Sequence, residues 1–251
     1  IGSVLGPNLA GPGADLGVRL GLPPLGGGFA LSAAAFLLVA ALLLAFLRPD
    51  PLLTARSLQV DHDEPDPTAG LEGEATRGWA VIRTRPDALM GVVAMALGHV
   101  VMVSVMIMTP LHMRHGQAGL EIIGLVISLH VVGMYAFSPL TGWAVDRWGS
   151  RAVIAVGAGV LLTASLLAAS TASGHSLRLT AALVLLGMGW SCTLIAGSTL
   201  LTAAVPLRQR PAAQGLSDVA MGLAGGGGGA LAGVVVGWWG YAALGLPAGG
   251  A

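Results

Sequence analysis

The sequence predicts an all-α integral membrane protein, and three observations carry that prediction. Apolar residues make up 55% of the 251 residues and charged residues only 10%, whereas about a quarter of the residues of a soluble domain are charged. The mean hydropathy is +0.81, and the apolar residues come in runs long enough to cross a bilayer, which takes about 20 helical residues. The runs lack the alternation typical of strands, which favours helices over a barrel.

The order of these runs predicts the helices and the loops between them. Residues 1–11 are expected to be the end of a helix, and residues 12–25 to form a loop rich in Gly and Pro. The predicted complete spans are residues 26–47, 88–109, 120–140, 152–171, 179–205 and 212–238, with a further span starting after Gly240. Because the chain starts within an apolar run and stops among small residues, we expect it to be a fragment of a longer protein.

Arginines predict the orientation of the spans. Loops on one side hold Arg48, Arg56, Arg77, Arg83, Arg85, Arg147, Arg151, Arg208 and Arg210, whereas the opposite loops hold Arg19, Arg114 and Arg178. The positive-inside rule places the first set in the cytoplasm of a multi-pass protein of the plasma membrane. The long loop of residues 48–87 is therefore expected to be a cytoplasmic linker. Its acidic cluster, residues 61–66, is interpreted as a solvated face rather than a metal site.

Residues 142–151, GWAVDRWGSR, form a short charged loop between two predicted spans. Gly142, Asp146, Arg147, Gly149 and Arg151 give it a pattern that resembles the signature loop of the major facilitator superfamily, a family of secondary transporters. In that family the loop acts as a latch that steadies one end of the transport cycle. We expect Asp146 to cap a helix N-terminus or to pair with Arg147 or Arg151. The family often has a basic residue where this chain has a serine, and a plain turn with cytoplasmic arginines is the alternative.

Residues 2–11 carry a second motif, which is similar to the end of the helix 5 motif of proton-coupled drug antiporters in the same family. Its matching residues are Gly2, Gly6, Pro7 and Gly11, while Ala10 replaces a glycine of the family pattern. A proline inside a membrane helix kinks it and frees backbone groups. This motif points to export rather than uptake.

The two resemblances imply the major facilitator fold, of which this chain would hold a part. Residues 1–47 would be a remnant of the N-terminal helical bundle, with the end of the fifth helix and the whole sixth. Residues 48–87 would be the central linker. Residues 88–251 would hold helices seven to eleven of the C-terminal bundle and the start of the twelfth, while helices one to four would be missing.

Four side chains inside the predicted spans are candidates for proton coupling or substrate contact. His99 and His130 lie about 17 and 15 Å into their spans, and an ionisable side chain at such a depth indicates function by default. Trp190 lies in a span rich in Gly, Ser and Thr, which is expected to line a cavity or a helix seam, and its indole could stack on a substrate. Asp218 lies near the cytoplasmic end of its span. For all four, ordinary structural roles remain the alternative: satisfied core histidines, a packed tryptophan, and an acid near Arg208 or Arg210.

Glycine spacing, the single cysteine and a pair of histidines bear on helix packing, disulfides and metal binding. Glycines recur every fourth residue at Gly225, Gly229, Gly233 and Gly237, which predicts close approach by another helix, either as fixed packing or as a sliding contact. Cys192 is the only cysteine, so no disulfide framework is possible. Residues 112–115 hold two histidines beside a methionine, and an extracellular turn is favoured there over a metal site.

The resemblance implies a secondary active transporter that exports small amphipathic molecules in exchange for protons, by alternating access. The expected partners are a small-molecule substrate, protons and the lipid bilayer, with the proton gradient as the energy source and no cofactor, metal or nucleic acid. A monomer is expected. A solute uptake symporter and a non-transporting receptor of the same fold are the alternatives, and the lack of clustered ligands or a nucleophile argues against an enzyme.

Overall fold

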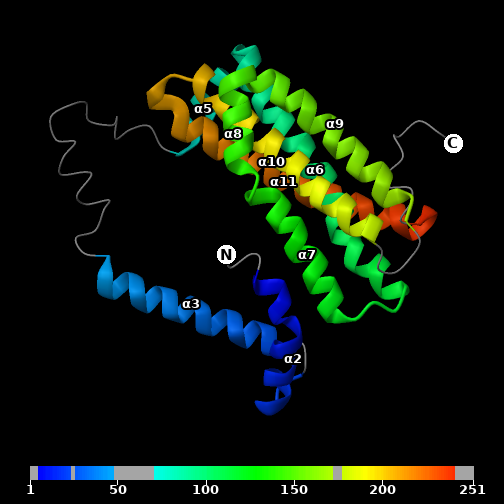
Figure 1. The fold of residues 1–251 in the computed structure, drawn as a ribbon. Helices are drawn as coiled ribbons and strands as arrows, with labels where there is room; N and C mark the ends of the chain where they lie inside the picture. The colour runs from blue at the N-terminus through cyan, green and yellow to red at the C-terminus, as the bar shows by residue number, and fades with distance from the viewer. Residues whose placement is uncertain (1–4, 24–25, 48–70, 172–176, 241–251) are drawn as a thin grey trace. The chain divides into compact units, whose positions relative to one another are not determined.

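The computed structural model of the chain describes residues 5–23, 26–47, 71–171 and 177–240. Within these ranges every regular element is a helix (Figure 1), and six helical stretches are long and apolar enough to cross a membrane. The all-helical membrane fold predicted from the sequence is therefore confirmed. Gly2, the acidic cluster of residues 61–66 and the span expected after Gly240 lie outside the described residues.

The chain divides into two compact units, and the smaller comprises Asn8–Gly73. It contains α2 (Ala10–Arg19) and α3 (Gly26–Phe46), and a short 3-10 helix, η1 (Gly6–Leu9), leads into α2. The sequence predicted a loop over residues 12–25. This prediction is wrong for residues 12–19, because helix α2 extends to Arg19. Pro12 is tolerated in its first turn, where the backbone N–H would have no intrahelical partner.

Helices α2 and α3 contact each other at glycines, whereas most of α3 is bare. A Cβ on Gly27 of α3 would collide with the backbone of Gly13 and Gly17 in α2, so small residues allow the two backbones to touch. Farther along α3, Phe29, Phe36 and Phe46 are 80%, 76% and 79% exposed. Such a surface is stable only when lipid or another apolar helix covers it.

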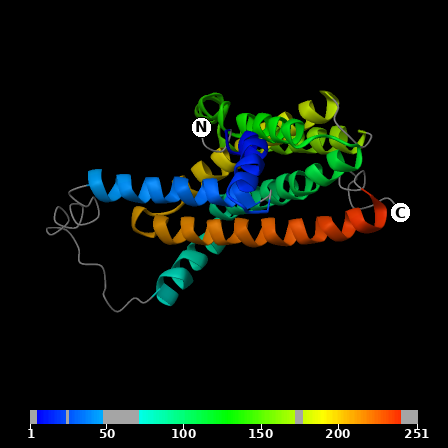
Figure 2. The same ribbon diagram turned by 90° about the horizontal axis from the view of Figure 1, so that it is seen from below.

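The larger unit comprises Glu74–Ala251 together with Ile1–Pro7 and is a helical bundle. Its helices are α5 (Leu71–Thr84), α6 (Pro86–His115), α7 (Leu120–Tyr135), α8 (Ser138–Trp148), α9 (Ser150–Ala169), α10 (Leu177–Ala204), the 3-10 helix η2 (Leu207–Gln209) and α11 (Arg210–Trp239). Figure 2 shows α11 as a long, nearly straight helix. Helix α6 extends beyond its predicted span at both ends, since polar first and last turns lower the hydropathy without ending a helix.

Helix α5 occupies the end of the segment that the sequence assigned to the linker. Its Ile82 is 1% exposed and belongs to a core cluster with Ala88 and Val92 of α6 and Leu201 of α10. On the same side of α5, Gly78 lies against α11, where an added Cβ would be 3.2 Å from the backbone carbon of Ala212. Most of this helix therefore packs as part of the bundle.

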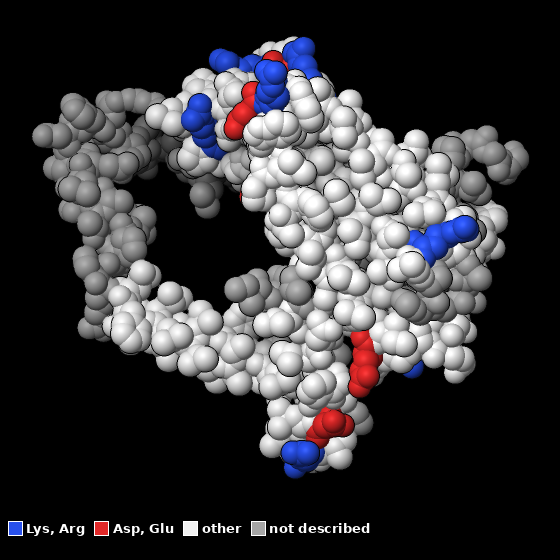
Figure 3. Space-filling model, viewed as in Figure 1, with Lys and Arg blue, Asp and Glu red and all other residues white. Residues whose placement is uncertain are grey.

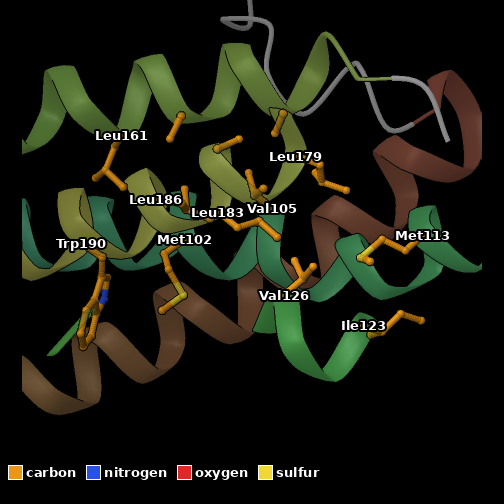
Figure 4. Packing of buried hydrophobic residues seen from close by; sticks show 13 residues of the cluster. Met102, Val105, Met113, Ile123, Val126, Leu161, Leu179, Leu183, Leu186 and Trp190 are labelled. Atoms are coloured by element: carbon orange, nitrogen blue, oxygen red, sulfur yellow. The ribbon is translucent and has the colours of Figure 1, made fainter. Parts of the chain in front are cut away.

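Helix α10 is the most deeply buried of the spans and contacts α6, α7 and α9 (Figure 1). Figure 4 shows the main core cluster, in which Leu183 and Leu186 of α10 meet Leu161 of α9, Val105 of α6 and Val126 of α7. At the end of α10, the guanidinium groups of Arg85 and Arg210 donate hydrogen bonds to the carbonyl oxygens of Ala204 and Val205. These bonds satisfy carbonyls that have no partner within the helix.

Three glycines of α10 make its close contacts possible. A Cβ on Gly187 would lie 2.9 Å from the Met134 amide nitrogen of α7, and one on Gly189 would lie 2.9 Å from the Leu161 amide nitrogen of α9. A Cβ on Gly197 would lie 2.8 Å from the Gly91 carbonyl oxygen of α6. The polar, glycine-rich span was predicted to line a cavity or a helix seam, and the structure shows three seams.

Candidate functional site

An aromatic and imidazole cluster, consisting of His99, Tyr135 and Trp190, joins α6, α7 and α10. The indole Nε1–H of Trp190 donates a hydrogen bond to His99 Nδ1 over 3.0 Å, and the two ring centroids lie 6.2 Å apart. Tyr135 packs edge-on against the same indole, with the centroids again 6.2 Å apart. The structure thus brings two of the residues predicted from the sequence, His99 and Trp190, into direct contact.

The cluster lies midway along α6, along α10 and along the stretch Leu120–Trp148, which α7 and α8 form together. His99 and Trp190 are each about 20 Å from the start of α6 and α10, and Tyr135 is about 22 Å from the start of α7. Because α6 has 30 residues and α10 has 28, these helices are about 45 and 42 Å long. A cluster at their midpoint would lie near the middle of a bilayer whose apolar core is about 30 Å thick.

A break between α7 and α8 fixes the position of Tyr135. The span predicted over residues 120–140 lies within one apolar helical stretch, Leu120–Trp148, but its helix is interrupted, since α7 ends at Tyr135 and α8 begins at Ser138. In a continuous helix Pro139 would clash with the carbonyl of Tyr135, four residues earlier, and would remove a backbone donor. The predicted span is therefore present, and Pro139 explains the interruption within it, which was not predicted from the sequence.

The members of the cluster differ in exposure. Trp190 is only 6% exposed, whereas Tyr135 is 55% exposed and His99 is half-buried. Trp190 is therefore the buried member of the cluster. The exposed surface of the cluster belongs to Tyr135 and, in part, to His99. The direct stacking of Trp190 on a substrate, considered from the sequence, would require its neighbours to move aside.

Helix α11 approaches the imidazole from a further side. A Cβ on Gly225 would lie 2.7 Å from His99 Cδ2 and 2.9 Å from His99 Nε2. Only a glycine allows the α11 backbone this close to the imidazole. Within the described part of the chain, His99 Nε2 makes no hydrogen bond, and it lies against α11 at Gly225.

His130 lies in a different environment, and the structure does not join it to the cluster. It is 1% exposed, and its Nδ1 is 2.7 Å from the carbonyl oxygen of Leu183 in α10. Leu183 precedes Trp190 by about two helical turns, or about 10 Å. The carbonyl is an acceptor, so Nδ1 carries the proton, and the buried Nε2 has no partner among the described residues.

Asp218 is exposed on α11 and makes no contact with the cluster. Gly225, which touches His99, lies about 10 Å farther along the helix. The expected neighbour Arg210 donates instead to the carbonyl oxygen of Val205. In the described part of the chain Asp218 has no ion pair, so its exposed carboxylate offers no geometric support for a specific role.

The signature loop joins α8 to α9, and the predicted pairing of Asp146 within it is wrong. Arg151 forms an ion pair with Asp87, at the start of α6, over 2.5 Å. Asp146 lies in the last turn of α8 and caps neither helix, because the N-termini of α8 and α9 have no side-chain cap hydrogen bond. Gly149 has φ +83° and ψ 153°, a conformation open only to glycine, and this lets the chain turn directly from α8 into α9.

For the remaining predicted site residues, the structure shows few contacts with other side chains. Gly142 faces open space on α8, and Arg147 is exposed at the end of that helix. In the second motif, Gly6 and Pro7 form part of η1 and Gly11 part of α2. The described residues contain no group of three His, Cys, Asp or Glu side chains that could hold a metal ion.

Sequence reasoning missed Tyr135, Asp87 and the specific role of Gly225. A signal existed for the first, since a proline four residues later predicts the end of a helix at that point. Asp87 was assigned to the linker although an acid in the first turn of a helix is common. The contact of Gly225 with His99 joins two separate helices, and neither local pattern indicates it.

The comparisons with known proteins agree with this architecture. The model of the Major Facilitator Superfamily matches residues 117–250, which is more than half of the chain. The chain belongs to the major facilitator superfamily. It is therefore part of a multi-pass membrane transporter family, as its six apolar stretches also indicate.

Two relatives of this superfamily align with nearly the whole chain, and both come from Bacillus subtilis (strain 168). The uncharacterized MFS-type transporter YdeG is 38% identical over 98% of this chain and 56% of its own length. The uncharacterized MFS-type transporter YddS is 39% identical over 97% of this chain and 55% of its own length. The chain thus spans a little over half of the length of these relatives. No solved structure matches it.

Proposed function

We propose that the complete protein exports small amphipathic molecules in exchange for protons, and that His99 takes part in proton coupling or substrate contact. The observation that carries the proposal is the hydrogen bond from Trp190 to His99 midway along the bundle. Imidazole is the side chain that exchanges protons near neutral pH. An ionisable side chain inside a membrane span indicates a proton or substrate pathway by default.

The composition of the cluster supports a substrate with an apolar body and one polar group. Tyr135 presents an exposed aromatic ring, and neutral His99 offers a single N–H donor at Nε2. Pockets that bind small organic molecules combine apolar lining with a few placed polar groups. The direction of transport rests on the resemblance of Gly6, Pro7 and Gly11 to the antiporter motif.

The arginine distribution supports an orientation with the α8–α9 loop in the cytoplasm. Figure 3 shows basic side chains gathered at the end of the bundle where α5, α8 and the start of α9 lie, and Arg83, Arg147 and Arg151 are exposed there. The positive-inside rule assigns that end to the cytoplasmic side of the plasma membrane. A cysteine placed at Trp148 should react with a membrane-impermeant maleimide only after the cells are opened.

The test of function uses the complete protein in proteoliposomes that contain a pH-sensitive dye. Cationic and amphipathic compounds are added under an imposed proton gradient. Proton movement that depends on the compound, and that falls at least tenfold in His99→Gln, would support exchange through His99. If proton movement is the same in His99→Gln as in the wild type, coupling lies elsewhere. His130→Gln is then the next variant to test. Uptake together with protons would indicate a symporter, and no movement with any compound would contradict transport of this class.

A further inference from the structure

We propose that Trp190 is a positioning residue that fixes which nitrogen of His99 carries the proton, so that proton uptake by His99 and loss of the Trp190 contact are one event. The inference rests on the proposed function only for its consequence in transport. Its own basis is the chemistry of two side chains and their geometry.

The indole N–H can act only as a hydrogen-bond donor. His99 Nδ1, which is 3.0 Å from Trp190 Nε1, must therefore present a lone pair. A neutral imidazole has one N–H, so in this contact the proton lies on Nε2. The hydrogen bond thus selects one of the two neutral tautomers and is incompatible with the imidazolium ion, in which both nitrogens carry protons.

Proton uptake by His99 must therefore break this bond. The only basic lone pair of the neutral ring is the one that Trp190 occupies. When a proton binds to Nδ1, the indole N–H loses its acceptor, and two N–H groups face each other at hydrogen-bond distance. Either the imidazole or the indole has to turn away, while no other covalent bond changes.

The surroundings contain no described charge that would hold a protonated ring in place. On α6 itself the nearest acid is Asp87, about 18 Å away along the helix. Helix α10 has no acid, and its only charged residue is Arg178 near its start. The acid of α11, Asp218, is about 10 Å along the helix from Gly225, and on α7 the ionisable groups are Glu121, His130 and Tyr135, of which only Tyr135 touches Trp190.

The packing of α11 transmits this change. The edge of the imidazole that carries Nε2 and Cδ2 rests against the α11 backbone at Gly225, so a rotation of His99 alters the contact between α6 and α11. One turn farther along α11, Ser104 Oγ of α6 donates a hydrogen bond to the Gly228 carbonyl over 3.1 Å. Protonation would therefore affect the contact of α10 with α6 and the contact of α11 with α6 together.

The experiment measures the Trp190 environment directly. The complete protein is labelled with 5-fluorotryptophan, reconstituted in lipid nanodiscs and studied by fluorine NMR between pH 5 and 8. The Trp190 signal is assigned by its loss in Trp190→Phe. We expect this signal to shift on acidification in the wild type and to remain constant in His99→Gln, because the Gln side chain can accept the indole hydrogen bond but does not titrate.

A signal that stays constant in the wild type, or that shifts equally in His99→Gln, would overturn the inference. The Trp143 signal serves as an internal reference, because this residue packs against Trp148 and should behave identically in both proteins. The measurement needs no substrate, so its failure is distinguishable from a failure of transport.

A second readout connects the contact to transport. In Trp190→Phe the neutral ring loses a hydrogen bond and the packing is largely kept. Compound-driven proton flux should then reach half of its maximum at a pH higher by about half a unit or more. An unchanged pH profile would contradict the coupling of Trp190 to His99.

Discussion

Helices α10 and α11 are both long, apolar and rich in glycine, yet a larger share of the glycines of α10 than of those of α11 contacts a neighbouring helix. Gly187, Gly189 and Gly197 of α10 each lie against the backbone or side chain of a neighbouring helix. Helix α11 contains an unbroken run of glycines at residues 225–229, but only one face of it is covered. An added Cβ would meet nothing within 4 Å at Gly215, Gly222, Gly226, Gly227, Gly233 and Gly237.

This difference shows that glycine content alone does not identify a helix seam. The pattern of Gly225, Gly229, Gly233 and Gly237 predicted close approach by another helix on one face of α11. The structure supports it at Gly225 and, less tightly, at Gly229, and places another close contact at Gly228. At Gly233 and Gly237 no neighbour approaches within the described part of the chain. The chain spans only a little over half of its relatives' length, so the prediction stays untested there. Helix α10 is held on three sides, whereas α11 is attached along α6 with His99 in the contact.

The largest effect is expected from filling a backbone contact of α10. In Gly187→Ala the new methyl group would lie 2.9 Å from the Met134 amide nitrogen and 3.1 Å from the Gly133 carbonyl carbon. Because backbone atoms cannot rotate away, we expect a loss of about 3 kcal/mol of stability. Thermal unfolding of the complete protein in detergent, followed by size-exclusion chromatography, measures this loss.

Gly159→Ala in α9 is the matched control for that substitution. Its added Cβ would meet nothing within 4 Å, and alanine raises helix propensity by up to about 1 kcal/mol over glycine. The melting temperature should stay equal or rise. A Gly187→Ala protein as stable as Gly159→Ala would contradict the close contact between α7 and α10.

A smaller effect is expected at the contact of α11 with His99. In Gly225→Ala the methyl group meets an imidazole, which can yield, rather than backbone. We expect about 1 kcal/mol of destabilisation and a clear loss of compound-driven proton flux, because His99 must leave its position against Trp190.

Gly226→Ala tests whether that loss is specific. It changes the next residue of the same helix, where an added Cβ meets nothing within 4 Å. Stability and flux should remain close to those of the wild type. Equal losses in the two variants would show that α11 needs its glycines for flexibility rather than for the contact with His99.

The sequence predicted the fold class, the existence of the spans and the family, because long apolar runs in a membrane leave only the helical solution. It did not predict the break at Tyr135 or the helix at residues 10–19. In both regions prolines decided the outcome: Pro139 ends a helix four residues earlier, whereas Pro12 is tolerated in a first turn. The effect of a proline depends on its position in a helix, which apolar content does not reveal.

The candidate site was predictable in its residues but not in its connections. The depth of His99 and the polar character of the span around Trp190 were visible in the sequence. The hydrogen bond between them, the contact of Tyr135 and the approach of Gly225 depend on how four helices are arranged. In the same way, the loop motif was visible, but the ion pair of Arg151 with Asp87 instead of Asp146 depends on α9 starting beside α6.

A modest effect is expected from the hydrogen bond that fastens α11 to α6. Ser104 Oγ donates to the Gly228 carbonyl, and such bonds between membrane helices contribute about 0.6 kcal/mol. Ser104→Ala should lower the stability by about this amount, and Ser104→Thr should retain much of it. A loss similar to that of Gly187→Ala would mean that α11 is held as tightly as α10.

The smallest effect is expected at the surface. Arg151 and Asp87 form an ion pair with side chains that are 68% and 42% exposed, and exposed pairs contribute little because water and salt screen them. Asp87→Asn should leave the melting temperature nearly unchanged at 0.5 M salt. A large loss in Asp87→Asn that disappears in the charge-exchanged double variant, Asp87→Arg with Arg151→Asp, would show that this pair is essential.

The central claim is that α10 stays fixed within the bundle while α11 responds to the protonation of His99. Distances between spin labels test it in the complete protein with Cys192→Ala, comparing the pair Gly159→Cys with Thr199→Cys against the pair Gly159→Cys with Gly226→Cys. We predict that lowering the pH from 8 to 5 leaves the α9–α10 distance unchanged and changes the α9–α11 distance. In His99→Gln the α9–α11 distance should no longer change with pH. An α9–α11 distance that does not change with pH, or that changes equally in His99→Gln, would contradict the account.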